Sequence, residues 1–265
     1  MLHIENYLHP STLAEACDIL ESEPASVVLG GCGYLRLGAR KIGTAIDLSR
    51  LGLEYIQETG GTIEIGAMTT LGAIENHPLT ANLSGGVLPA AVRNIVGVQL
   101  RNCVTIGGTV AGRYPFSDPL TALLALDASL QFVKSGRMPL VEYLHGKGGR
   151  DILEKIIIPD DGRLAAFTSV RKAATDYAVL NVAVAKGADS FRVVVGSRPG
   201  RAVFAESAAE YLAQHGLDSR TAEMAGAMAA KELQFGDNPR GSAEYRRAIC
   251  PVLVRRALTE VMHAA

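Results

Sequence analysis

The sequence contains no tryptophan, and aromatic residues make up only 5% of its 265 residues. Its four cysteines, Cys17, Cys32, Cys103 and Cys250, form no C-x-x-C pair and no Cys/His spacing typical of zinc. They therefore provide no framework for an iron–sulfur cluster on this chain. Four reduced thiols in a cytosolic protein are the simplest expectation.

A strong charge of one sign and long apolar runs are also missing. The formal net charge is -1, which argues against broad binding to nucleic acid or to an anionic membrane. No apolar run approaches the roughly 20 residues that cross a bilayer. The N-terminus has no basic region followed by an apolar stretch, so no signal peptide is expected. The predicted location is the cytoplasm.

Aliphatic residues and glycine are abundant instead. Hydrophobic residues make up 48% of the chain and there are 28 glycines, which predicts a sizeable aliphatic core and many tight turns. The six histidines are dispersed and share no ligand-like spacing with one another or with Ser and Asp. We therefore predict no catalytic side chain and no metal site.

The most informative stretch is TIGGTVAGRYPFSD, at residues 105–118. Its first two residues have the pattern of a strand end. Gly107 and Gly108 then remove the β-carbons from the backbone, which permits close approach of another group. Thr109 adds a hydroxyl beside these amides, a donor set suited to phosphate oxygens.

Three residues near this stretch have more than one interpretation. Asp118 either caps the apolar helix expected from Leu120 or accepts a hydrogen bond from a ligand hydroxyl or amine. Arg101 either pairs with an anionic ligand group or binds backbone carbonyls near the turn. Cys103 is interpreted as a small buried residue rather than a redox thiol.

A second glycine-rich loop, GGCGYL at residues 30–35, follows a short apolar strand pattern at 27–29. A loop of this kind after a strand often holds a phosphate. Two familiar phosphate motifs are excluded. Arg36 occupies the third glycine position of G-x-G-x-x-G, and no G-K-S/T follows.

The two segments together resemble the FAD subunits of the xanthine dehydrogenase family of molybdenum hydroxylases, including the carbon monoxide dehydrogenase flavoproteins. In that family the first flavin-binding segment is commonly A-G-G-T-D-L. The second is T-I-G-G-N, followed by a small residue, Ser-Pro and an Asp. This sequence departs from the first segment at Cys32, Gly33 and Tyr34, and from the second at Thr109 and Tyr114.

The resemblance covers essentially the whole chain and implies an α+β fold. A two-lobed FAD-binding domain of the p-cresol methylhydroxylase type is expected over residues 1–159, with lobes at about 1–55 and 56–159. A smaller α+β C-terminal domain is expected over residues 160–265. FAD would lie extended between the two lobes.

The C-terminal region has its own pattern. Strands are predicted at 167–172, 178–185 and 191–195, and three helices follow them. This order suggests a separate α+β layer. Arg246 is one of four arginines on the last helix, which is interpreted either as a solvated face or as a docking face for another subunit.

The resemblance also implies the cofactor, FAD, and its site. The pyrophosphate is expected against the loops at 30–35 and 105–109, with Asp118 bonded to the ADP part. Arg101 is a candidate partner for a phosphate or for reduced flavin. The predicted cofactor-binding residues are Val28, Leu29, Gly30, Gly31, Cys32, Gly33, Tyr34, Leu35, Arg101, Thr105, Ile106, Gly107, Gly108, Thr109 and Asp118.

The function that the resemblance implies is electron relay within an FAD-dependent oxidoreductase. In the family, hydroxylation takes place at a molybdopterin on a large partner subunit. Electrons then pass through 2Fe–2S clusters on a small partner subunit to FAD, and on to NAD+ or another acceptor. Two alternatives stay open: a flavin-free structural or assembly subunit of such a complex, and a free-standing flavin reductase of the same fold.

Overall fold

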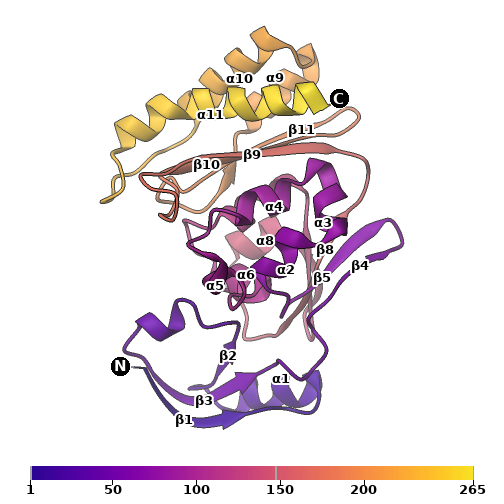
Figure 1. Ribbon diagram of the computed structural model, residues 1–265, viewed down its shortest axis with the longest axis vertical. Helices are drawn as coiled ribbons and strands as arrows, with labels where there is room; N and C mark the ends of the chain where they lie inside the picture. Colours follow the sequence, from indigo (N-terminus) through magenta and orange to yellow (C-terminus); the bar gives the residue numbers. More distant parts are fainter. Residues whose placement is uncertain (1, 147, 265) are drawn as a thin grey trace.

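The computed structural model describes residues 2–146 and 148–264. Its strands form three separate sheets, which follow one another along the chain and are stacked in the same order (Figure 1). The sheets have three, five and four strands, and helices pack against all three. This mixed arrangement of two lobes and a C-terminal layer is the predicted α+β architecture.

The first sheet belongs to the N-terminal lobe and is parallel, with the order β1-β3-β2. Helix α1 packs on it because Ala16, Cys17 and Leu20 share one face and are buried against Ile46. The elements of this lobe are β1 (His3–Leu8), α1 (Leu13–Ser22), β2 (Val27–Leu29), η1 (Leu35–Leu37) and β3 (Lys41–Asp47).

The second sheet is antiparallel, with the order β4-β5-β8-β6-β7. Its central strand β8 comes late in the chain, so that Thr62 of β5 pairs with Pro159 of β8. The alternating pattern predicted at 62–67 and the apolar run before Pro159 are both strands. The strands are β4 (Ile56–Thr59), β5 (Thr62–Gly66), β6 (Ser129–Phe132), β7 (Gly136–Pro139) and β8 (Leu153–Pro159).

Short helices cover this second sheet; one local expectation about them is wrong, and one of the two interpretations of Asp118 is excluded. Thr105 does not end a strand: it caps helix α6, and its Oγ1 accepts a hydrogen bond from the N–H of Gly108 at 3.1 Å. Asp118 does not cap α7, because the side chain of Ser117 takes that position. The helices are α2 (Leu71–Asn76), α3 (Pro78–Asn82), η2 (Leu83–Gly85), α4 (Val87–Val92), α5 (Val98–Arg101), α6 (Ile106–Gly112), α7 (Asp118–Ala125) and α8 (Leu140–His145).

The third sheet lies between two layers of helices (Figure 1). One face packs on α4 and α7 of the second lobe and the other on α9, α10 and α11, which explains the almost continuous apolar sequence of β10. We propose the division at 159/160 as a domain boundary, since β8 completes one sheet and β9 begins the next. The elements are β9 (Leu164–Val170), β10 (Leu180–Lys186), β11 (Phe191–Gly196), β12 (Val203–Phe204), α9 (Glu206–His215), α10 (Ser219–Glu232) and α11 (Ala243–Ala264).

Arg246 of α11 is completely buried, so it belongs to neither a solvated nor a docking face. Its Nε donates to the carbonyl of Val179 at 2.8 Å, and its Nη1 donates to the carbonyls of Gly236 (2.7 Å) and Gly241. Its Nη2 donates to Oδ1 of Asn238 at 2.6 Å. The guanidinium thus satisfies polar groups of the loop before α11, which a pattern of charges on a helix does not predict.

Candidate functional site

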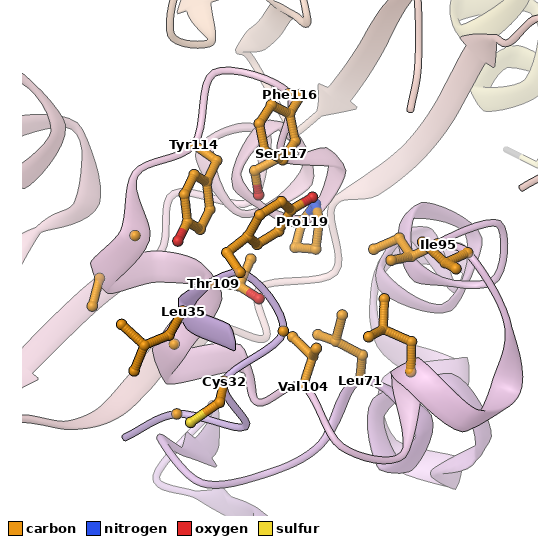
Figure 2. Close-up of a pocket in the computed structure, with 18 of the residues that line it drawn as sticks. Cys32, Leu35, Leu71, Ile95, Val104, Thr109, Tyr114, Phe116, Ser117 and Pro119 are labelled. Carbon is orange, nitrogen blue, oxygen red and sulfur yellow. The ribbon is translucent and has the colours of Figure 1, made fainter. Parts of the chain in front are cut away.

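A cavity of about 360 Å³ lies where the two lobes and the C-terminal layer meet. Aliphatic side chains line one side, among them Leu71, Ile95 and Val104 (Figure 2). Aromatic side chains line the other side, with Tyr114 and Phe116 close together. A cavity with apolar and aromatic walls is typical of sites for small-molecule ligands and cofactors.

The loop at residues 30–35 forms one edge of this cavity. Gly31 has a φ of +74°, and a β-carbon there would lie 2.0 Å from the carbonyl oxygen of Cys103. Cys32 also has a positive φ, of 56°. Among the described residues, no acceptor is bonded to the backbone N–H groups of residues 31–34. These partly exposed amides are free to bind an anion such as a phosphate.

The amides of the second glycine segment are already bonded within the protein. The N–H of Gly107 donates to the carbonyl of Ala67 at 2.9 Å, and that of Gly108 donates to Oγ1 of Thr105. The Thr109 hydroxyl donates to the carbonyl of Thr105 at 3.0 Å. The donor set expected here is therefore occupied by the turn that begins α6.

Close backbone approach is the role that the structure gives to these glycines. A β-carbon on Gly108 would lie 2.4 Å from the carbonyl oxygen of Gly30, and one on Gly30 would lie 2.7 Å from Cα of Gly108. A β-carbon on Gly107 would lie 2.5 Å from the carbonyl oxygen of Ala67. Glycine at these positions lets the first loop touch the second segment, and this contact forms the floor of the cavity.

All but one of the cofactor-binding residues predicted from the sequence fall into two groups. One group lines the cavity: Val28, Gly30, Cys32, Gly33, Tyr34, Leu35, Gly108, Thr109 and Asp118. The other group lies behind the lining and supports it: Leu29, Gly31, Thr105, Ile106 and Gly107.

Arg101 is directed away from the cavity lining. Its Nε pairs with Oε2 of Glu75 at 2.7 Å, and its Nη1 donates to the carbonyl of Ile95 at 3.2 Å. Of the two interpretations, the structure shows the carbonyl contact together with an ion pair that the sequence did not indicate. Cys103 is exposed, so its interpretation as a buried residue is wrong. The turn before Thr105 leaves its side chain on the surface.

An aromatic cluster closes one end of the cavity. Tyr34, Tyr114, Phe116 and Tyr177 have ring centroids 4.5–6.1 Å apart, and the rings of Tyr114 and Phe116 are stacked. The Tyr34 hydroxyl donates to the Tyr177 hydroxyl. Burial, reinforced by this hydrogen bond, raises the pKa of Tyr34, so the phenol stays protonated. Sequence reasoning noted Tyr34 and Tyr114 as departures but missed Phe116 and Tyr177.

Asp118 lies at the wall between the second lobe and the third sheet, with only 3% of its surface exposed. Its carboxylate accepts hydrogen bonds from Arg171 and Asn181, both from the C-terminal region. Burial raises the pKa of Asp118, while the charge and hydrogen bond of Arg171 act against that rise. Sequence reasoning did not identify Arg171, which also lines the cavity.

These features fit FAD. The free amides at residues 31–34 suit a diphosphate, the apolar and aromatic walls suit planar rings, and Arg171 adds a cation. Within residues 2–146 and 148–264, no group of His, Cys, Asp or Glu side chains is arranged to hold a metal ion. None of the helices in these ranges has the length and apolar character needed to cross a membrane.

Comparison with known proteins identifies the class and then the family. A family model described as the FAD-binding domain in molybdopterin dehydrogenase matches residues 2–161. A second model, the CO dehydrogenase flavoprotein C-terminal domain, matches residues 165–261. The chain is therefore a flavoprotein-type oxidoreductase subunit. It belongs to the family of FAD-binding subunits of the molybdenum hydroxylases, which confirms the predicted family, fold class and cofactor.

Relatives from this family are similar to the chain over nearly its full length. The nicotine 6-hydroxylase medium subunit of Paenarthrobacter nicotinovorans is 28% identical over 96% of both chains. The carbon monoxide dehydrogenase medium chain of Afipia carboxidovorans is 27% identical over 96% of this chain and 95% of its own. In a crystal structure of Cu,Mo-CO dehydrogenase, a chain 24% identical to this one matches over the full length of both, with a TM-score of 0.91.

Proposed function

We propose that this chain is the FAD-carrying medium subunit of a molybdenum hydroxylase complex. It would receive electrons from 2Fe–2S clusters on a small partner subunit, while a large partner subunit holds the molybdopterin. The final acceptor is NAD+ or another electron acceptor. The relatives named as medium subunits and medium chains support this assignment.

The observation that carries the proposal is the cavity between the glycine segments. Its loop amides at 31–34 have no acceptor among the described residues, and Gly30 and Gly108 bring the two lobes together beneath it. Bound FAD supplies the redox chemistry by taking up and releasing electrons. The residues of this chain bind the cofactor, exclude water from its apolar side and fix its orientation. No side chain of the cavity has to act as an acid or a base.

Cofactor extraction tests the proposal. The purified chain should release FAD rather than FMN, because two lobes joined around a phosphate-binding loop suit a diphosphate. Chromatography of the extracted flavin identifies it, and reconstitution with excess FAD covers loss during purification. Recovery of FMN, or a chain that stays colourless after reconstitution, would contradict the proposal. The second result would support the flavin-free structural subunit instead.

Purification from the native host tests the partners. A medium subunit should be isolated with one larger and one smaller chain, together with molybdenum and iron. A free-standing flavin reductase would be isolated alone and would oxidise NADH with free acceptors. Addition of NAD+ or of artificial acceptors to the reduced complex then identifies which of them accepts electrons.

A further inference from the structure

A buried polar network joins helix α7 to the third sheet beside the cavity. Oδ2 of Asp118 accepts from Nη2 of Arg171, and Oδ1 accepts from Nδ2 of Asn181. Asn181 is itself held in place, because its Oδ1 accepts from Thr121 at 3.0 Å and its Nδ2 donates to Ser197 at 3.1 Å. Both carboxylate oxygens of Asp118 thus point into the junction, which leaves little of the carboxylate for a ligand.

Arg171 faces both this network and the cavity. Its side chain is only 8% exposed, and its Nη1 donates to the carbonyl of Asp176 at 2.7 Å. Its Nε is buried and has no acceptor among the described residues. A buried guanidinium N–H without an acceptor is unfavourable and rare. Because Arg171 also lines the cavity, a group bound there is the candidate for the missing acceptor.

We propose that Arg171 is a cofactor-binding residue that donates to an anionic group of FAD, and that Asp118 and Asn181 are positioning residues that act through it. This inference rests on the proposed function. FAD offers two such groups: its diphosphate, and the pyrimidine edge of the isoalloxazine, which gains negative charge on reduction. A planar guanidinium suits either one.

Arg171→Met tests the first part in the full-length chain, since it removes the donors and keeps much of the volume. If Arg171 binds the diphosphate, the affinity of the apo protein for FAD, measured by quenching of flavin fluorescence, should fall about ten- to a hundredfold. Arg163→Met is the matched control. Arg163 is also largely buried, with 12% of its side chain exposed, and pairs with Asp161, but it does not line the cavity. Its FAD affinity should equal that of the wild type.

Two further measurements identify the anionic group. If the diphosphate is bound, ADP should also lose about ten- to a hundredfold in affinity. If the isoalloxazine edge is bound, the variant should bind oxidised FAD within about twofold of wild type. Its midpoint potential should fall by about 30–60 mV, because for a two-electron couple this shift corresponds to a ten- to hundredfold weaker binding of reduced FAD. Unchanged FAD affinity, ADP affinity and potential would overturn the role of Arg171.

A double substitution tests the positioning role of Asp118. Asp118→Asn alone should weaken FAD about tenfold and should have no further effect in the Arg171→Met background. Independent losses that multiply would show that Asp118 contacts the cofactor itself, and would overturn the positioning role. The double variant removes both charges of the buried pair, so it serves as the test if Arg171→Met alone does not fold. Failure of the wild-type chain to bind FAD would count against the proposed function and not against this network.

Discussion

The loop at 30–35 and the segment at 105–109 both carry adjacent glycines at the same cavity, yet they differ in conformation and in bonding. In the loop, Gly31 and Cys32 have positive φ and the following amides are free. In the segment, the glycines are helical and their amides are bonded to Ala67 and Thr105. A pair of glycines therefore indicates close approach, and the approaching group can be the protein's own backbone.

The difference separates two tasks. The loop has backbone donors without acceptors among the described residues, whereas the segment, with its amides bonded, is the support on which the loop rests. Substitutions in the segment should mainly affect folding at Gly107 and cofactor binding at Gly108. A β-carbon on Gly108 would meet Gly30 of the loop, whereas one on Gly107 would meet Ala67. Four substitutions test this difference between the loop and the segment.

The largest expected effect is that of Gly107→Ala. The new methyl group would lie 2.5 Å from the carbonyl oxygen of Ala67 and 2.7 Å from its Cβ, in fully packed surroundings. We expect a loss of about 3 kcal/mol in the free energy of unfolding, measured by urea denaturation of the apo protein. Gly149→Ala is the control, since a methyl group there meets nothing within 4 Å. Equal stability of the two variants would show that the segment is not a rigid support.

Gly108→Val should abolish FAD binding in a chain that still folds. Its side chain would push against the carbonyl oxygen of Gly30, and the partly exposed loop would move away. We expect at least a hundredfold loss of affinity, about 2.7 kcal/mol, with the unfolding free energy of the apo protein changed by about 1 kcal/mol. Flavin titration and thermal melting measure the two effects. A normal flavin content would mean that the contact between loop and segment is not needed for binding.

The strands beneath the segment give a pH-dependent test. Lys155 of β8 bonds Glu64 of β5 at 2.8 Å, and this hydrogen bond lowers the pKa of Glu64 below its ordinary value of 4.5. A lowered pKa in the folded state stabilises the protein above pH 4.5, and that stability is lost as the pH falls through the folded-state pKa. Glu64→Gln should therefore lose about 1 kcal/mol at pH 7, and this loss should shrink as the pH falls below 4.5 and through the folded-state pKa of Glu64. A pH-independent difference in denaturation midpoint would contradict the assigned cause.

The smallest effect is expected at Cys32, where the resembling family has threonine. Cys32→Ser places a hydroxyl in the loop without β-branching, which suits the positive φ of 56°. An added hydrogen bond to the cofactor contributes about 1 kcal/mol, so FAD should bind about fivefold more tightly. Stability of the apo protein should stay within about 0.5 kcal/mol. Weaker binding of FAD would show that this side chain does not face a polar part of the cofactor.

Local sequence patterns predicted most of the secondary structure because they depend on near neighbours. The three C-terminal strand patterns correspond to β9, β10 and β11, and the apolar helix expected from Leu120 is α7. The failure at Thr105 has a local cause, since a threonine before small residues suits a helix cap as well as a strand end. Here the bond from Gly108 to its hydroxyl decides in favour of the cap.

The walls of the cavity were harder to predict because they come from distant parts of the chain. The family resemblance placed the two glycine segments at one site, and both line or support the cavity. Arg171 and Tyr177 reach it because β9 packs on α4 and β10 packs on α7, and no local pattern shows this. In the same way, the charge pattern of the last helix does not show that Arg246 is buried against distant Val179 and the loop that precedes its own helix.

Strand β8 lies far along the chain from its partner β5, so the second sheet is incomplete during part of translation. The loop at 30–35 is synthesised early. The partner of β5, at Leu153–Pro159, is synthesised much later, and Tyr177 is the last residue of the cavity lining to be made. At about 5–20 residues per second, synthesis from the loop to Tyr177 takes on the order of ten seconds. Until β8 has been made, β5 has one edge without its partner strand, and an unpaired edge can pair with other chains. The residues that line the cavity are all present only once synthesis has passed Tyr177, so the cofactor site is completed only after that point.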